Sequence, residues 1–176
     1  HASVLLVQQE IPLDVTFAAM NAARVAGVTV VLDPAPARKL PEGFVEAADI
    51  VVPNQIEAEA VTGVPVHDVE SASEAASALR ARGLKAAIIK LGKDGCYVDS
   101  TEVVGHFPGF KVEPVSTVAA GDAFAAGLAV GISEGMGIRD AVGLGNAAGA
   151  LCVTKLGAQD SMPTRAEVQN LLAAAC

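Results

Sequence analysis

The chain has 176 residues, which is long enough for one domain with a substantial hydrophobic core and too short for two domains of ordinary size. Hydrophobic residues make up 52% of it and charged residues 18%, so a disordered segment is excluded. A net charge of −8 argues against binding to a phosphate backbone, and an aromatic content of 3% leaves few rings on which single-stranded bases could stack.

The first half of the sequence alternates short β-branched runs with segments of helical periodicity. We expect strands at 4–7, 28–32, 50–52 and 87–91, and helices at 14–26, 55–62 and 72–82. The first helix ends at Gly27 and carries, on one face, Val15, Ala18, Ala22 and Val25. The third helix has the spacing of one buried face at Ala72, Ala75, Ala76 and Leu79.

The second half predicts a hairpin followed by helices. The hairpin joins 96–99 to 103–107 around Ser100 and Thr101, and the helices cover 121–134, 139–154 and 165–174. The first two of these helices are apolar nearly all round, which predicts that they are buried. Together, the elements predict an α/β fold, a mostly parallel sheet covered by helices on both faces, in one domain.

The cysteines and the apolar runs limit where the protein can work. Cys96, Cys152 and Cys176 are an odd number without a Cys-x-x-Cys pair, so we expect no disulfide framework and a reducing cytoplasm. The longest apolar runs, 123–132 and 147–153, are shorter than the roughly 18 residues of a membrane span, so no membrane partner is expected.

Ligands of parallel α/β sheets bind beyond the carboxyl ends of the strands. Four polar or glycine-rich segments follow predicted strands, at 8–10, 33–38, 53–57 and 92–95, and a fifth, Ala119-Ala120-Gly121-Asp122, opens a helix. Small residues at a helix start let backbone amides approach an anion, and Asp122 beside a bound phosphate could take a proton from an attacking hydroxyl. An Asp that only stabilises the helix dipole explains the spacing equally well.

Asn54 and Glu57 stand three residues apart at the start of a short helix. Glu57 could order water around Mg²⁺, although this spacing alone favours a capping box. The segment from Leu91 through Gly92, Lys93 and Asp94 to Gly95 could wrap a nucleotide phosphate or form an ordinary tight turn. His67 and His106 are expected at the surface, and the sequence lacks a phosphate-binding P-loop and a Gly-x-Gly-x-x-Gly motif.

Six stretches occur in the order found in the ribokinase-like (PfkB) carbohydrate kinases, and the chain resembles the carboxyl-terminal part of that family. They are Asp33-Pro-Ala-Pro-Ala-Arg38, Pro53-Asn-Gln-Ile-Glu-Ala-Glu59 with Thr62-Gly63, Leu91-Gly-x-x-Gly95, Phe107-Pro-Gly-Phe110, Thr117-Val-Ala-Ala-Gly-Asp-Ala-Phe124 and Gly157-Ala-Gln159. The resemblance implies that residues 1–176 are the nucleotide-binding and catalytic part of a ribokinase-like domain whose amino-terminal half and lid are absent from this sequence.

The resemblance implies a role for each matching residue. Asp122 is the expected base, and the amides of Ala119, Ala120, Gly121 and Asp122 form the expected anion hole. Glu10 is expected at the sugar, Glu57 on Mg²⁺ through water, and Asn146 near the adenine. The nucleotide phosphates and ribose are expected to contact Asn54 and the segment formed by Lys90, Leu91, Gly92, Lys93, Asp94 and Gly95.

The resemblance also implies a monovalent cation, usually K⁺, behind the anion hole. Its expected ligands lie at or near Ser116, Val118, Cys152, Lys155, Gly157 and Ser161. Ser116 stands where the family normally has Asp, and a neutral hydroxyl balances no cationic charge. We therefore expect weak dependence on K⁺.

The implied activity is ATP-dependent phosphorylation of a small sugar, with D-ribose to D-ribose 5-phosphate favoured, in a protein that is a homodimer at full length. The same chemistry on another sugar or a nucleoside is one alternative. A nucleotide-binding fragment without turnover is another, because the amino-terminal half that holds most of the sugar in this family is missing. An unrelated α/β domain with similar loops is a third.

Overall fold

The computed structural model describes residues 2–175 and divides the chain into two compact units. Unit 1 comprises His1–Leu91 and Cys96–His106, and unit 2 comprises Gly92–Gly95 and Phe107–Cys176. His1 and Cys176 themselves lie outside the described residues. The two units are defined by the contacts within each of them, and this does not test the prediction that the chain is part of a single domain.

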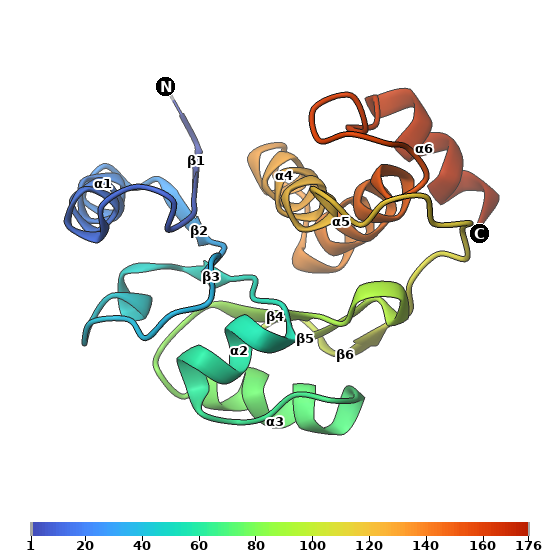
Figure 1. Cartoon of the computed structure of the whole chain (residues 1–176). Coiled ribbons are helices and arrows are strands. Elements are labelled where there is room, and N and C mark those ends of the chain that lie inside the picture. The colour runs from blue at the N-terminus through green and yellow to red at the C-terminus, as the bar shows by residue number, and fades with distance from the viewer. Residues whose placement is uncertain (1, 176) are drawn as a thin grey trace. The chain divides into compact units, whose positions relative to one another are not determined.

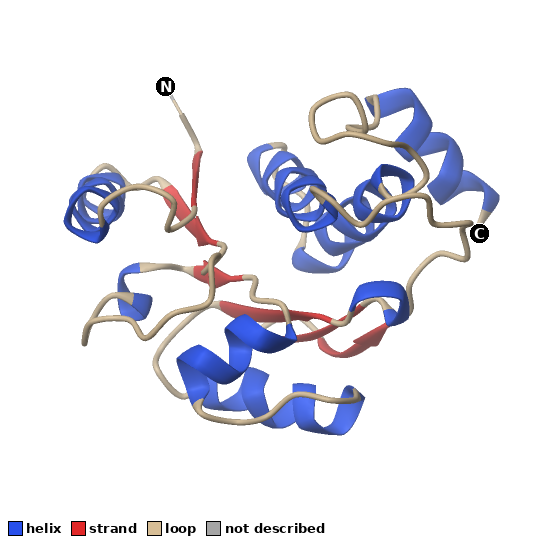
Figure 2. Cartoon of the chain, viewed as in Figure 1, coloured by secondary structure: helices blue, strands red, loops and turns tan. Residues whose placement is uncertain are grey.

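A six-stranded sheet forms the frame of unit 1 (Figures 1 and 2), and its strands follow one another in chain order. They are β1 (Val4–Val7), β2 (Thr29–Leu32), β3 (Ile50–Val51), β4 (Ala86–Lys90), β5 (Cys96–Ser100) and β6 (Val104–Phe107). The pairs β1–β2, β2–β3 and β3–β4 are parallel, and β4–β5 is antiparallel. The mostly parallel sheet predicted from the sequence is confirmed.

The helices of unit 1 pack on one face of this sheet. They are α1 (Leu13–Val25), the 3₁₀ turn η1 (Val45–Ala47), α2 (Gln55–Thr62) and α3 (Val69–Arg80). Because each crossover joins neighbouring parallel strands and such crossovers are right-handed, all are carried to the same face. Their shared core contains alternate strand residues, such as Leu32, Val51 and Ala87, with Met20 of α1 and Leu79 of α3. Helices on the second face stay a prediction.

Two details of these helices differ from the sequence prediction. The apolar face expected on α1 is exposed, with Val15 at 51% and Val25 at 91%, while Thr16 and Met20 are buried. The start of α3 is Val69 rather than residue 72, because Asp68 and Ser71 form a capping box that accommodates an additional turn. The buried face predicted for α3, at Ala72, Ala75, Ala76 and Leu79, is confirmed.

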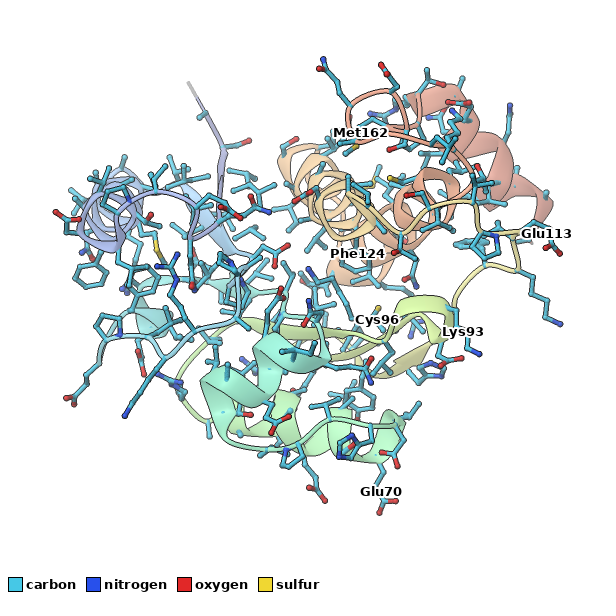
Figure 3. The ribbon with its side chains drawn as sticks, in the orientation of Figure 1. Glu70, Lys93, Cys96, Glu113, Phe124 and Met162 are labelled. Atoms are coloured by element: carbon cyan, nitrogen blue, oxygen red, sulfur yellow. The ribbon has the colours of Figure 1, made fainter. Side chains whose placement is uncertain are left out.

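Unit 2 is built on α4 (Ala120–Ser133), α5 (Ile138–Cys152) and α6 (Arg165–Ala174). Glycines bring α4 and α5 into backbone contact: a Cβ on Gly127 would lie 2.8 Å from the Leu144 carbonyl oxygen, and one on Gly145 would lie 2.9 Å from that of Phe124 (labelled in Figure 3). The two helices were expected to be buried nearly all round, but Val130 of α4 is 44% exposed. The apolar composition of α4 therefore reflects small residues packed on one side rather than burial on every side.

Cys96 and Cys152 are buried and form no disulfide, and no helix within residues 2–175 combines the length and the apolar character needed to cross a membrane. His67 and His106 are exposed, as the sequence predicted.

Candidate active-site residues

Four polar side chains gather at the carboxyl ends of the parallel strands of unit 1. This carboxyl-edge cluster consists of Asp33, Asn54, Glu57 and Lys90. Backbone pairing brings the residues together: the Asp33 amide donates to the Val7 carbonyl at 2.9 Å, the Lys90 amide donates to the Pro53 carbonyl at 2.8 Å, and Asn54 forms a parallel bridge with Lys90. Parallel pairing alone therefore places polar residues from β2, β3 and β4 at one edge.

Asn54 and Glu57 form the capping box of α2. The Glu57 amide donates to Asn54 Oδ1 at 2.9 Å, and the Asn54 amide donates to Glu57 Oε2 at 2.7 Å. Asn54 Nδ2 also donates to Glu57 Oε1 at 2.7 Å, so both carboxylate oxygens are oriented. Glu57 is only 5% exposed, whereas a capping-box glutamate on a surface helix usually faces water. The capping interpretation is confirmed, and each oxygen keeps a lone pair for a further donor such as water.

Lys90 connects the cluster. Its Nζ donates to Asp33 Oδ2 at 2.8 Å and lies 4.0 Å from Glu57 Oε2. The Lys90 and Asp33 side chains are 12% and 2% exposed, so this is a buried ion pair. The sequence predicts Asp33 only as part of the Asp33–Arg38 motif and does not predict its contact with Lys90. The sequence did contain a hint of it, because Lys90 lies near the end of one predicted strand and Asp33 directly follows another.

A second contact joins the loops after β1 and β2. Arg38 Nε donates to Gln9 Oε1 at 3.1 Å, and its terminal nitrogen donates to the Gln9 carbonyl. The Gln9 amide in turn donates to the Ala35 carbonyl at 2.8 Å. Glu10, predicted at the sugar, is exposed directly after this buried glutamine. Arg38 and Gln9 thus fix the backbone from which Glu10 projects.

The glycine-rich loop of unit 2 is held by backbone packing. Gly95 has φ of 88° and is buried, and a Cβ there would lie 2.0 Å from the Phe107 carbonyl oxygen. A Cβ on Gly109 would lie 2.3 Å from the Lys93 carbonyl oxygen. Lys93, Asp94 and Gly92 are exposed, and Figure 3 shows the Lys93 side chain at the surface. The Phe107-Pro-Gly-Phe110 motif therefore acts as the support for the loop formed by 92–95.

The amino-terminal end of α4 has a strained start. Ala119 adopts φ of 62°, the one positive φ of a non-glycine residue among those described. Such a conformation costs on the order of 1–3 kcal/mol and persists where surrounding structure imposes it. The first regular helical bond runs from the Ala123 amide to the Ala119 carbonyl at 2.9 Å. The amides of Ala120, Gly121 and Asp122 precede it, and Asp122 is exposed.

Packing against α5 fixes this end of α4. A Cβ on Gly149 would lie 3.2 Å from the Ala120 carbonyl oxygen, so no larger residue fits there without a shift. Asn146, predicted near the adenine, lies three residues earlier on α5 and is half-buried. The small residues of α5 thus locate both the predicted anion hole and Asn146.

Most of the residues predicted around the monovalent cation meet in unit 2. Cys152 Sγ lies 3.6 Å from the Val118 carbonyl oxygen and 3.2 Å from Ser161 Oγ, and Ser161 Oγ donates to the Ala158 carbonyl at 2.7 Å. Ser116 Oγ accepts from the Val118 amide at 3.3 Å. Gly157 has φ of 98° in the loop that follows, and it is exposed. No cluster of three or more metal-binding side chains occurs within residues 2–175.

Lys155 differs from the other residues predicted around the monovalent cation, because its side chain forms a hydrogen bond with a residue of α6. Its Nζ donates to Glu167 Oε1 at 2.8 Å. This hydrogen bond, with the Thr164 cap, lowers the pKa of Glu167 to about 2. Only the backbone of Lys155, whose amide donates to the Cys152 carbonyl at 3.3 Å, stays close to Cys152.

Comparison with known proteins then decides the family. The sequence profile of the pfkB family carbohydrate kinases matches residues 1–165 of this chain. The chain belongs to this family. The resemblance drawn from the six motifs is therefore confirmed.

Relatives of this pfkB-family chain include ribokinases from Haemophilus influenzae and Staphylococcus aureus. They are 41% and 36% identical over 172 residues each. The matches cover 98% and 97% of this chain, but only 56% and 57% of the relatives. The chain thus spans a little more than half the length of the curated relatives it matches.

Solved structures give the same result for the fold. Ribokinase from Thermotoga maritima superimposes with a TM-score of 0.87 at 37% identity, covering 97% of this chain and 57% of that structure. Arabidopsis thaliana ribokinase, complexed with ribose and ATP, superimposes with a TM-score of 0.90 at 32% identity, covering 97% and 56%. The ribokinase-like fold predicted from the sequence is confirmed.

The support under the glycine loop can be tested by Gly109→Ala. The added Cβ would meet the Lys93 carbonyl oxygen, so we expect a loss of about 1–3 kcal/mol in the free energy of unfolding, measured with denaturant. Gly143→Ala is the matched control, because its Cβ would find only Leu172 Cδ2 at 3.8 Å in a helix interior, where Ala is favoured over Gly. Equal stability of the two variants would contradict the assigned role of Gly109.

Proposed function

We propose that the protein containing this chain transfers the γ-phosphoryl group of ATP to a hydroxyl of D-ribose, giving D-ribose 5-phosphate and ADP. The observation that supports this most strongly is the similarity to Arabidopsis ribokinase complexed with ribose and ATP, which extends over 97% of the chain. Deoxyribokinases from Salmonella typhi and Salmonella typhimurium match a shorter part, 122 residues at 34% identity, so 2-deoxy-D-ribose is the competing sugar to test.

Asp122 is proposed as the general base. Its carboxylate takes the proton of the primary hydroxyl as that oxygen attacks the γ-phosphorus, and the bond between the γ-phosphorus and the bridging oxygen of ADP breaks. The amino-terminal end of α4 carries about half a positive charge, and the amides of Ala119, Ala120, Gly121 and Asp122 are proposed to stabilise the charge that develops on the transferred group. The strained Ala119 supports this role, since it sets the direction of these amides.

The remaining binding roles follow the family motifs. We propose that Asn54 and the residues from Lys90 through Leu91, Gly92, Lys93 and Asp94 to Gly95 bind the nucleotide phosphates and ribose. Asn146 is proposed to lie near the adenine and Glu10 near the sugar. The rigid support of Gly95 by Phe107 and Gly109 favours a loop whose backbone amides are already in place before ATP binds.

The position of Glu57 is suitable for binding Mg²⁺ through a water molecule. Its carboxylate is buried and oriented by Asn54, and a single carboxylate that contacts the ion's water shell is typical because Mg²⁺ keeps several waters and binds substrate phosphates. When bound, Mg²⁺ neutralises charge on the β- and γ-phosphates. The protein's part is to hold the Glu57 carboxylate in place.

The cation site is proposed to be weak. Fructokinase from Vibrio cholerae, a neighbour at 25% identity and a TM-score of 0.78, has been described with fructose, ADP and potassium ion bound. Here the corresponding donors are neutral: the Val118 carbonyl already accepts from the Cys152 thiol, and Ser116 supplies a hydroxyl. Such a set offers oxygen atoms but no counter-charge.

The buried cysteines Cys96 and Cys152, which form no disulfide, support a reducing compartment, and we propose that the reaction takes place in the cytoplasm with ATP and a small sugar as partners. Binding to nucleic acid or to a membrane is not part of the proposal, and a homodimer of the whole protein remains the family-based prediction.

The proposal is tested by ADP release from Mg·ATP with and without D-ribose, 2-deoxy-D-ribose or fructose, comparing wild type with Asp122→Asn. Loss of the base should lower ribose-dependent turnover about 10²- to 10⁴-fold while ATP affinity changes little. Asp140→Asn is the control, because Asp140 is also an exposed acid in the first turn of a helix of unit 2. Unchanged turnover in Asp122→Asn would refute the base, and ATP binding without sugar-stimulated release would indicate a nucleotide-binding fragment.

Replacing Glu57 by Gln should raise the Mg²⁺ concentration needed for half-maximal activity about 10-fold, because the amide carries no charge for the ion's water shell. Glu167→Gln is the matched control, since Glu167 closes the capping box of α6 in the same way. An identical Mg²⁺ titration for wild type and Glu57→Gln would remove Glu57 from the metal site.

Wild-type activity should rise less than about twofold when K⁺ replaces a large organic cation, because Ser116 gives the site no carboxylate. Ser116→Asp should increase this activation by adding the missing charge. The measurement is initial rate against K⁺ concentration at constant ionic strength. Strong, saturable activation of the wild type by millimolar K⁺ would contradict the proposal.

A further inference from the structure

Lys90 lies between two buried carboxylates. Its Nζ is 2.8 Å from Asp33 Oδ2 and 4.0 Å from Glu57 Oε2. The three side chains are 12%, 2% and 7% exposed, respectively, so water screens these charges poorly. Three charges in one buried cluster, two negative and one positive, cannot all be satisfied by one ion pair.

The strand order makes the Asp33 contact possible. Asp33 follows β2 and Lys90 ends β4, so the ion pair reaches across the end of β3, where Pro53 has no amide hydrogen to donate. Strands β2 and β4 are two strand spacings of about 4.8 Å apart, and the long lysine stem together with the Asp33 side chain spans that separation. Asp33 thereby holds the ammonium group closer to its own carboxylate, at 2.8 Å, than to that of Glu57, at 4.0 Å.

Glu57 consequently makes its close hydrogen bonds with neutral donors. Its two oxygens accept from the Asn54 amide and from Asn54 Nδ2, both at 2.7 Å, while Lys90 stays beyond hydrogen-bond distance. The Lys90–Glu57 ion pair is thus longer, at 4.0 Å, than the Lys90–Asp33 ion pair at 2.8 Å, and the two carboxylates with one ammonium group keep a net negative charge.

We propose that Asp33 is a positioning residue for the Mg²⁺ function of Glu57: by holding Lys90 in an ion pair, it keeps the negative charge of Glu57 available to the water shell of the ion. This inference rests on the proposed function, because it requires Glu57 to act on Mg²⁺. Without the Asp33 charge, the buried ammonium group moves to the nearest remaining carboxylate, which is Glu57.

The test measures ATP affinity by calorimetry over a series of Mg²⁺ concentrations for Asp33→Asn, Lys90→Met and Asp33→Asn/Lys90→Met. We expect Asp33→Asn to raise the half-effective Mg²⁺ concentration about 10-fold, the lower end of what outer partners of a metal site contribute. In the double variant the competing ammonium group is gone, so the half-effective Mg²⁺ concentration should return to that of Lys90→Met. Melting temperatures show that each variant is folded.

Removing both partners of a buried ion pair can also restore stability, so charge positioning is separated from a structural role by comparing the variants where Asp33→Asn and the double variant are both fully folded. A folded Asp33→Asn variant with the wild-type Mg²⁺ dependence would overturn the inference, and so would a double variant as impaired as Asp33→Asn. Glu57→Gln, measured in parallel, tests the premise: an unchanged Mg²⁺ dependence there refutes the metal role of Glu57 and the inference with it. Because the readout is ATP binding, failure to phosphorylate D-ribose would count against the proposed function alone.

Discussion

Parallel pairing of β1, β2, β3 and β4 in chain order is the constraint on which unit 1 depends. The pairing aligns Val7, Leu32 and Val51 side by side, so the residues that follow each strand end at the same edge. Right-handed crossovers then carry α1, α2 and α3 to one face, where they bury Met20 and Leu79 against the strands. The carboxyl-edge cluster depends on this pairing, because it brings the ends of β2, β3 and β4 together and so places Asp33, Lys90 and the start of α2 at one edge.

Unit 2 uses close backbone contact instead of a sheet. Gly127, Gly131, Gly145 and Gly149 let α4 and α5 approach until side chains would clash with backbone, and this fixes the start of α4. A glycine in a helix costs up to about 1 kcal/mol relative to Ala, so these positions exchange local stability for a defined geometry. The strained Ala119 at the start of α4 packs against a hydrophobic cluster that includes Ala123 of α4 and Ala147 and Cys152 of α5.

In the carboxyl-edge cluster, the distances from Lys90 to the two carboxylates decide how strongly each carboxylate is paired with the ammonium group. A buried ammonium group with one carboxylate is a neutral pair, whereas a second carboxylate at 4.0 Å retains a charge that water cannot screen fully. Asn54 orients that carboxylate with uncharged donors, so Glu57 is both the cap of a helix and a buried negative group. The capping interpretation and the metal interpretation of this residue are thus compatible.

The sequence by itself determined the order of strands and helices, the capping box at Asn54 and Glu57, and the motifs that identify the pfkB family, because these depend on neighbours within a few residues. It misjudged α1, whose spacing does not tell which face meets the sheet, and it placed the start of α3 after the Asp68 cap. Only the tertiary structure decided that Asp33 and Lys90 meet across β3 and that Gly109 supports the loop at Lys93. Those contacts join residues separated by 57 and 16 positions, and only strand order and backbone packing bring such residues together.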